Sequence, residues 1–167
     1  MRVNVEDFNE IERFRDARDL VKLGMRVSII SALTGVTPHL VKKMWKDTYN
    51  QVSPSGQLPT SVHVFVKDAV TAANLSGFVA HCAMKYADLK LALTARNIII
   101  AQQQYRRLAG CEIDINTAYY ALRDVAARLV EWKHCCTCDA HYMYLVRSFP
   151  LRACPFCRLA PTSRKAA

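Results

Sequence analysis

The sequence predicts a mainly α-helical protein whose C-terminal end is built differently from the rest. Apolar residues recur at helical intervals through most of the 167 positions, and 51% of all residues are hydrophobic, enough to bury a core. From His134 onward the helical period stops, and short apolar pieces alternate with closely spaced cysteines. We therefore expect helices through residues 1–133, a cysteine-rich module at 134–158 and a basic tail at 159–167.

Residues 1–49 are expected to contain three helices. Apolar side chains at helical spacing cover about residues 8–23, and Gly24 can end that helix. A second, short helix is expected over about residues 26–33, before a turn at Gly35. The third helix follows that turn directly.

The third helix is expected to begin at Pro38. Thr37 is a good N-cap, and the missing N–H of a proline costs nothing at the first helical position. The pattern predicts a buried apolar stripe on this helix, formed by Leu40, Val41, Met44 and Trp45. The remaining face is basic and is expected to stay outside, with His39, Lys42, Lys43 and Lys46.

The stretch "VSIISALTGVTPHLVKKMWKDT" fits the frame of a helix-turn-helix. Ser31 is small where the two helices would face each other and Gly35 lies in the turn, although Thr34 stands where an apolar residue is usual. The helix from Pro38 would then be the recognition helix, and its basic side chains would reach phosphates. The candidate DNA contacts on it are Lys42, Lys43 and Lys46. An ordinary helical hairpin with a solvated lysine face is the alternative.

Residues 50–61, "NQVSPSGQLPTS", are expected to form a loop, because two prolines, one glycine and three serines interrupt the helical pattern. The helical body follows over residues 62–133. Asp114 can cap its last helix. The expected helices of the body cover about residues 62–86, 88–107 and 115–133.

The formal net charge of +9 is unevenly spread. Residues 1–19 hold six acidic and four basic side chains, whereas the remainder holds eight acidic and 19 basic ones. A basic body fits a polyanionic partner such as nucleic acid, although many soluble proteins are basic for solubility alone. We see neither a signal segment nor an apolar stretch long enough to cross a membrane, so we expect a cytoplasmic, reducing location.

Five of the seven cysteines lie in "CCTCDAHYMYLVRSFPLRACPFC", residues 135–157. In a reducing compartment such a cluster is more often a metal site or a redox motif than a set of disulfides. Two CxxC pairs separated by 15 residues match the spacing of structural zinc sites, and four thiolates leave no open position for water. We therefore predict a small four-cysteine zinc module with the ligands Cys135, Cys138, Cys154 and Cys157.

Cys136 is the surplus thiol of the cluster, because a C-x-C turn presents two sulfurs to one ion less well than C-x-x-C. Cys82 and Cys111 lie in or beside expected helices and are interpreted as small apolar residues. A set of three cysteines with His134 or His141, and iron–sulfur ligation by the same thiols, are alternatives. A thiol–disulfide enzyme would want a βαβ context, which the helical pattern does not offer.

Positive charge surrounds the cysteines. In residues 134–167 the only acidic residue is Asp139, whereas the basic residues are Arg147, Arg152, Arg158, Arg164 and Lys165. We expect this module to contact DNA phosphates, with Arg147, Arg152 and Arg158 as candidates and the lysines near the N-terminus as a weaker second patch.

Three stretches together resemble the FlhC family, a subunit of the bacterial flagellar master transcriptional activator. They are "RDLVKLGMRVSIISALTGVTPHLVKKMWKD", "SPSGQLP" with the following "HVFVKDA", and the paired CxxC segment. The "SPSGQLP" stretch is the most specific, because it stands at the family's position between the N-terminal helices and the body. Two departures are a tail of only ten residues after Cys157 and the placement of the extra cysteine at Cys136.

The resemblance implies a mainly helical chain with zinc on Cys135, Cys138, Cys154 and Cys157. It also implies assembly with a second protein, FlhD, as four FlhD and two FlhC chains, on DNA upstream of flagellar operons, with recruitment of RNA polymerase. We thus expect a DNA-binding activator subunit and not an enzyme. The alternative function is a zinc-stabilised adaptor that contacts proteins only.

Overall fold

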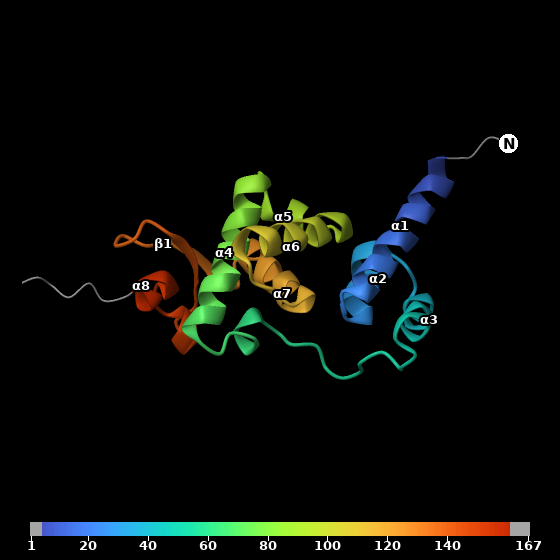
Figure 1. Ribbon diagram of the computed structural model, residues 1–167, viewed down its shortest axis with the longest axis horizontal. Helices are drawn as coiled ribbons and strands as arrows, with labels where there is room; N and C mark the ends of the chain where they lie inside the picture. Colours follow the sequence, from blue (N-terminus) through green and yellow to red (C-terminus); the bar gives the residue numbers. More distant parts are fainter. Residues whose placement is uncertain (1–4, 161–167) are drawn as a thin grey trace, which may run out of the picture.

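The computed structural model describes residues 5–160 and confirms a mainly helical fold with a small C-terminal sheet (Figure 1). The helices before the 50–61 loop gather at one end, the helices after it form the middle, and the cysteine module lies at the other end. No helix in that described range is both long and apolar enough to span a bilayer. The elements are α1 (Val5–Lys22), α2 (Val27–Thr34), α3 (Pro38–Tyr49), η1 (Val62–Val64), α4 (Ala69–Lys85), α5 (Leu89–Ala92), α6 (Ala95–Ala109), α7 (Ile115–Ala126), β1 (Glu131–His134), β2 (His141–Tyr144), η2 (Phe149–Leu151) and α8 (Pro155–Leu159).

The three N-terminal helices follow the sequence expectation closely. Gly24 has a φ of +78° just after α1 and Gly35 one of +69° after α2, a conformation that suits glycine because it has no Cβ. Pro38 is the first residue of α3, but Thr37 makes no side-chain capping bond. The start of α3 therefore owes more to the fixed φ of proline than to a cap.

The apolar stripe of α3 is narrower than predicted. Val41 and Trp45 are buried, and Met44 is half-buried. Leu40, expected in the stripe, is 37% exposed. It borders a small hollow with Phe14 of α1, so the seam between these two helices is not filled at that point.

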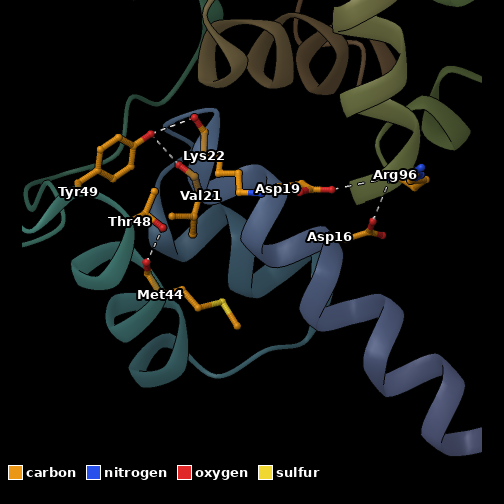
Figure 2. Close-up of polar contacts among 8 residues, drawn as sticks. All are labelled: Asp16, Asp19, Val21, Lys22, Met44, Thr48, Tyr49 and Arg96. Atoms are coloured by element: carbon orange, nitrogen blue, oxygen red, sulfur yellow. Dashed lines mark hydrogen bonds and ion pairs between the residues drawn. The ribbon is translucent and has the colours of Figure 1, made fainter.

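Polar contacts fasten the N-terminal helices to one another and to the body (Figure 2). The hydroxyl of Tyr49 donates to the carbonyl oxygens of Val21 and Lys22, 3.0 Å from each. Arg96 of α6 lies 3.9 Å from both Asp16 and Asp19 of α1. Apolar packing and these ion pairs join α1 to the body.

The loop between the two helical groups is irregular yet held at several points. The Nη2 of Arg26 donates to Gly56 O at 2.9 Å, and the Nη2 of Arg123 donates to Thr60 O at 2.6 Å. At the end of the loop the N–H of Val62 donates to the carboxylate of Asp124 at 2.6 Å. Asp124 is fully buried and paired with Arg123, so a charged pair of α7 fixes where the loop joins the body.

The first two body helices are shorter than predicted. The helix expected over 62–86 is a 3₁₀ turn, η1, followed by α4, because Asp68 caps α4 by accepting from Thr71 N at 2.7 Å. The helix expected over 88–107 is interrupted between α5 and α6. Thr94 accepts from Asn97 N there and begins α6.

The last body helix also ends earlier than predicted. Asp114 caps α7 as expected, but the helix stops at Ala126 instead of continuing to Lys133. Arg128 adopts a φ of +57°, and the carbonyl of Asp124 accepts from the next two amides. This turn releases the chain into β1, which pairs antiparallel with β2.

One hydrophobic core runs from α1 through the body to the edge of the cysteine module, where it includes Met143 and Leu151. A separate small cluster contains Cys135, Tyr142 and Cys154. The two meet at β2, where the N–H of Met143 donates to the hydroxyl of the fully buried Ser76 of α4 at 3.1 Å. The module is therefore anchored to the body by packing and by a buried hydrogen bond.

Candidate metal centre and its cationic surface

The structure brings together the four cysteines that the spacing selected. Their sulfur atoms all lie within 4.8 Å of one another. Sγ of Cys135 is 3.6 Å from Sγ of Cys157, and the Cys138 and Cys154 sulfurs are also 3.6 Å apart. Ligands about 2.3 Å from a tetrahedral zinc ion lie about 3.8 Å from each other, so the arrangement fits such an ion.

The first pair of thiols is held by a tight turn between the two strands. The N–H of Cys135 donates to Ala140 O and the N–H of Asp139 donates to Cys135 O, both at 2.9 Å. Asp139 adopts a φ of +61°, which reverses the chain. The turn thus places Cys135 and Cys138 on the same side.

The second pair is held by α8. Cys154 directly precedes this helix, and Pro155 is its first residue. The N–H of Arg158 donates to Cys154 O at 3.3 Å. One helical turn therefore brings Cys157 back beside Cys154.

The peptide groups around the thiols favour thiolate formation at one of them. Hydrogen bonds from the N–H groups of Cys138 and Thr137 lower the pKa of Cys135 to about 6. Hydrogen bonding with the Cys138 and Cys135 sulfurs raises the pKa of Cys157 to about 12. A metal ion that binds all four sulfurs as thiolates must displace the protons of those with a raised pKa, such as Cys157.

The other cysteines lie outside this cluster. Cys136 is exposed, Cys111 is half-buried, and Cys82 is a core residue whose pKa burial raises to about 12. Both histidines near the cluster are engaged elsewhere. His134 Nε2 is 2.7 Å from Asp139 Oδ1, and the rings of His134 and His141 are 4.9 Å apart.

The predicted DNA-contacting arginines are all exposed on the module. Arg152 and Arg158 lie over the ring of Phe149, with their guanidinium carbons 4.6 and 4.9 Å from the ring centroid. Nothing in the local sequence pattern of Phe149 predicts that two arginines converge on it. Arg164 and Lys165, also expected near the cysteines, lie outside the described residues.

The predicted lysine patch lies on α3, at the opposite end of the molecule from α8 (Figure 1). Its lysines line a hollow of about 410 Å³ together with residues of the 50–61 loop, a neighbourhood that the sequence analysis missed. The hollow is bordered by His39, Lys42, Lys43, Lys46, Val52, Ser53 and Ser55. The two basic patches are therefore separate surfaces.

Polar contacts in the turn between α2 and α3 accommodate the residue that departs from the helix-turn-helix frame. Thr34, at the position where an apolar residue is usual, is buried, and its hydroxyl donates to Ile30 O at 2.8 Å and accepts from Val36 N at 3.2 Å. The hydroxyl of Ser31 donates to Val36 O at 2.7 Å. The hydroxyl of Thr34 thus has both hydrogen-bond partners that it needs in order to be buried at a position where an apolar side chain is usual.

Fold and site together define a class: a mainly helical protein with a small module whose four cysteines can hold a structural metal ion. A family model for the flagellar transcriptional activator (FlhC) matches residues 4–167, essentially the whole chain. The chain belongs to the FlhC family, as its resemblance predicted. The search of curated proteins returned no match. Membership points to a transcriptional regulator and away from an enzyme.

Proposed function

We propose that this chain is the DNA-binding subunit of a heteromeric activator of flagellar genes and that it carries one structural zinc ion. The family supports the regulatory role. The observation that carries the DNA contact is the charge of the metal module. Its described residues 134–160 contain three exposed arginines and a single carboxylate, that of Asp139, which already pairs with His134.

Zinc is the proposed metal, held by Cys135, Cys138, Cys154 and Cys157. Four thiolates and no open position suit a structural ion, and the sulfur separations suit its tetrahedral geometry. The ion would join the β1–β2 turn to α8, two segments with little apolar surface of their own. Iron–sulfur ligation is the competing assignment, and metal analysis with an absorption spectrum separates the two.

We further propose that the chain acts in the cytoplasm with an FlhD-like subunit, as four FlhD-like chains with two of this chain, and that the complex recruits RNA polymerase to promoter DNA. These details extend what the family implies. The arginines of the module would position the complex on the phosphates. The lysines of α3 would form a second, weaker contact at the other end of the chain.

The experiment is a salt series of fluorescence anisotropy with the zinc-loaded chain, its FlhD-like partner and flagellar promoter DNA. Each phosphate contact contributes about 0.9 to the slope of log K against log salt, so Arg147→Gln should lower that slope by about one. Arg107→Gln is the matched control, because Arg107 is exposed on α6 and belongs to neither basic patch. A wild-type isotherm unchanged between low and moderate salt would contradict phosphate binding.

The second candidate function is an adaptor that contacts proteins only. A hollow between α1 and α3, lined by Ile11, Phe14, Arg15, Arg18 and Met44, favours it, because Ile11 is an exposed apolar side chain there. The same titration decides between the two functions. An assembled, zinc-loaded complex that shifts neither promoter DNA nor unrelated DNA would favour the adaptor.

A further inference from the structure

An exposed aromatic ring stands in the middle of the module's positive charge. Phe149 is 61% exposed, and the guanidinium groups of Arg152 and Arg158 both lie within 5 Å of its ring centroid. Arg158 also donates from Nη1 to the carbonyl oxygen of Phe149 at 3.4 Å. The two arginines come from opposite sides of Cys154 in the sequence, so the folded module gathers them around one ring.

The backbone under Phe149 is firmly held. Phe149 begins η2, whose last residue, Leu151, is fully buried in the main core. The N–H of Leu145 donates to Leu151 O at 3.1 Å, and the N–H of Ser148 donates to Leu145 O at 3.0 Å. The exposure of the ring is therefore a fixed property of the fold and not the result of a loosely placed segment.

Single exposed apolar residues are common and need no explanation, but this one is accompanied by charge. A guanidinium that lies over a ring still has N–H groups to offer to phosphate oxygens, and the contact with the ring reduces the side-chain freedom lost on binding. An apolar ring between two such groups matches a ligand that alternates anionic and apolar surface. Nucleic acid has this character, because sugars and base edges lie between its phosphates.

We propose that Phe149 is a DNA-contacting residue whose ring packs against sugars or base edges while Arg152 and Arg158 bind the flanking phosphates. This inference rests on the proposed DNA-binding function and adds an uncharged contact to it. A protein surface rich in acidic residues is a different partner that the same patch could meet, and the experiment treats it as an opposing outcome.

The test compares Phe149→Ala, Phe149→Leu and Arg152→Gln in the zinc-loaded complex with the FlhD-like partner, by anisotropy on promoter DNA over a salt series. Phe149→Ala should weaken binding about tenfold at every salt concentration, with an unchanged salt slope. Phe149→Leu should lose less DNA affinity than Phe149→Ala. Arg152→Gln should lower the slope by about one.

Val146→Ala is the matched control, because Val146 is an apolar side chain that is 65% exposed in the same segment and has no aromatic ring. Zinc content and thermal melting of each variant establish that the module is folded. Wild-type binding together with unchanged affinity in Phe149→Ala would overturn this inference and leave the proposed function standing. Weakened assembly with the partner at unchanged DNA affinity would also overturn it, whereas no DNA binding by the wild type would remove both proposals.

Discussion

The two basic ends of this molecule are built by different means. At the N-terminal end, α3 carries lysines on a helix whose inner face is buried in the main core, and those lysines border a hollow beside the loop. At the C-terminal end, the arginines stand on short segments that meet at four cysteines, and two of them lie over an aromatic ring. Lysines on a helix are mobile point charges, whereas arginines that lie over a ring are pre-positioned.

The two ends also differ in the interactions that stabilise them. The N-terminal end is stabilised by apolar packing of α1, α2 and α3 within the main core and by polar contacts such as those of Tyr49. The module has a small cluster of its own around Cys135, Tyr142 and Cys154 and is anchored to the main core at β2, and the proposed metal would add to this stability. Substitutions at one end should therefore leave the other end working.

The largest effect is expected from loss of a metal ligand. Cys154→Ser should abolish zinc binding, because it removes one of the four ligands. The module should then unfold while most of the helical signal remains, because zinc binding contributes about 10–16 kcal/mol to the folding free energy of structural sites. Cys136→Ser is the matched control and should retain about one zinc per chain. The measurements are zinc per chain and circular dichroism. Zinc loss on Cys136→Ser with retention on Cys154→Ser would refute the ligand assignment.

A core substitution at the other end should be costly without touching the metal. Trp45 is buried on α3 and its ring lies 5.0 Å from that of Tyr49. Trp45→Ala should lower the free energy of unfolding by about 3–5 kcal/mol, because it leaves a large cavity. Denaturant unfolding measures the loss, and zinc per chain should stay the same. Zinc release by this variant would break the proposed independence of the two ends.

The next largest effect is expected at Asp124, the buried carboxylate that joins the loop to the body. Asp124→Ala removes the acceptor of the Val62 N–H and the charge partner of Arg123. The expected loss of stability is about 3 kcal/mol, since breaking a buried pair strands the remaining groups. Limited proteolysis should show faster cleavage within residues 50–61. Cleavage at the wild-type rate would mean that the loop is fixed by its other contacts alone.

The smallest effect is expected where α1 meets α6. Arg96 is half-exposed and 3.9 Å from its partners, so Arg96→Gln should cost less than about 1 kcal/mol. Burial raises the pKa of Asp16 and Arg96 counteracts this, so the variant should raise that pKa further. A raised carboxyl pKa disfavours the charged form in the folded chain, so the variant should lose stability relative to wild type as the pH rises through this titration. A Tm of the variant that is lowered equally at pH values below and above the Asp16 titration would contradict the proposed ion pair between Asp16 and Arg96.

Local patterns predicted the parts of this structure that depend on local geometry. The cysteine set follows from two short spacings, and the start of α3 follows from Pro38. The strand β1 was missed because Leu129 and Trp132 continue the helical period of α7, and nothing in the sequence marks the left-handed turn at Arg128. The Asp68 cap, by contrast, carries a visible signal, since an aspartate precedes an apolar run.

Long-range contacts were beyond sequence reasoning. The role of Asp124 depends on an amide 62 positions away, and the surroundings of Phe149 depend on how the cysteines fold the module. Charge counting found both basic patches but could not tell that one borders a loop and the other surrounds a ring. These differences follow from tertiary packing.

The metal module is proposed to provide the main DNA contact. The most direct test compares two triple variants in the zinc-loaded complex by salt-dependent binding to promoter DNA. They are Arg147, Arg152 and Arg158 changed to Gln, and Lys42, Lys43 and Lys46 changed to Gln. The arginine variant should lose about two to three units of salt slope and the lysine variant distinctly less. A wild-type slope in the arginine variant, with the loss confined to the lysine variant, would contradict the claim.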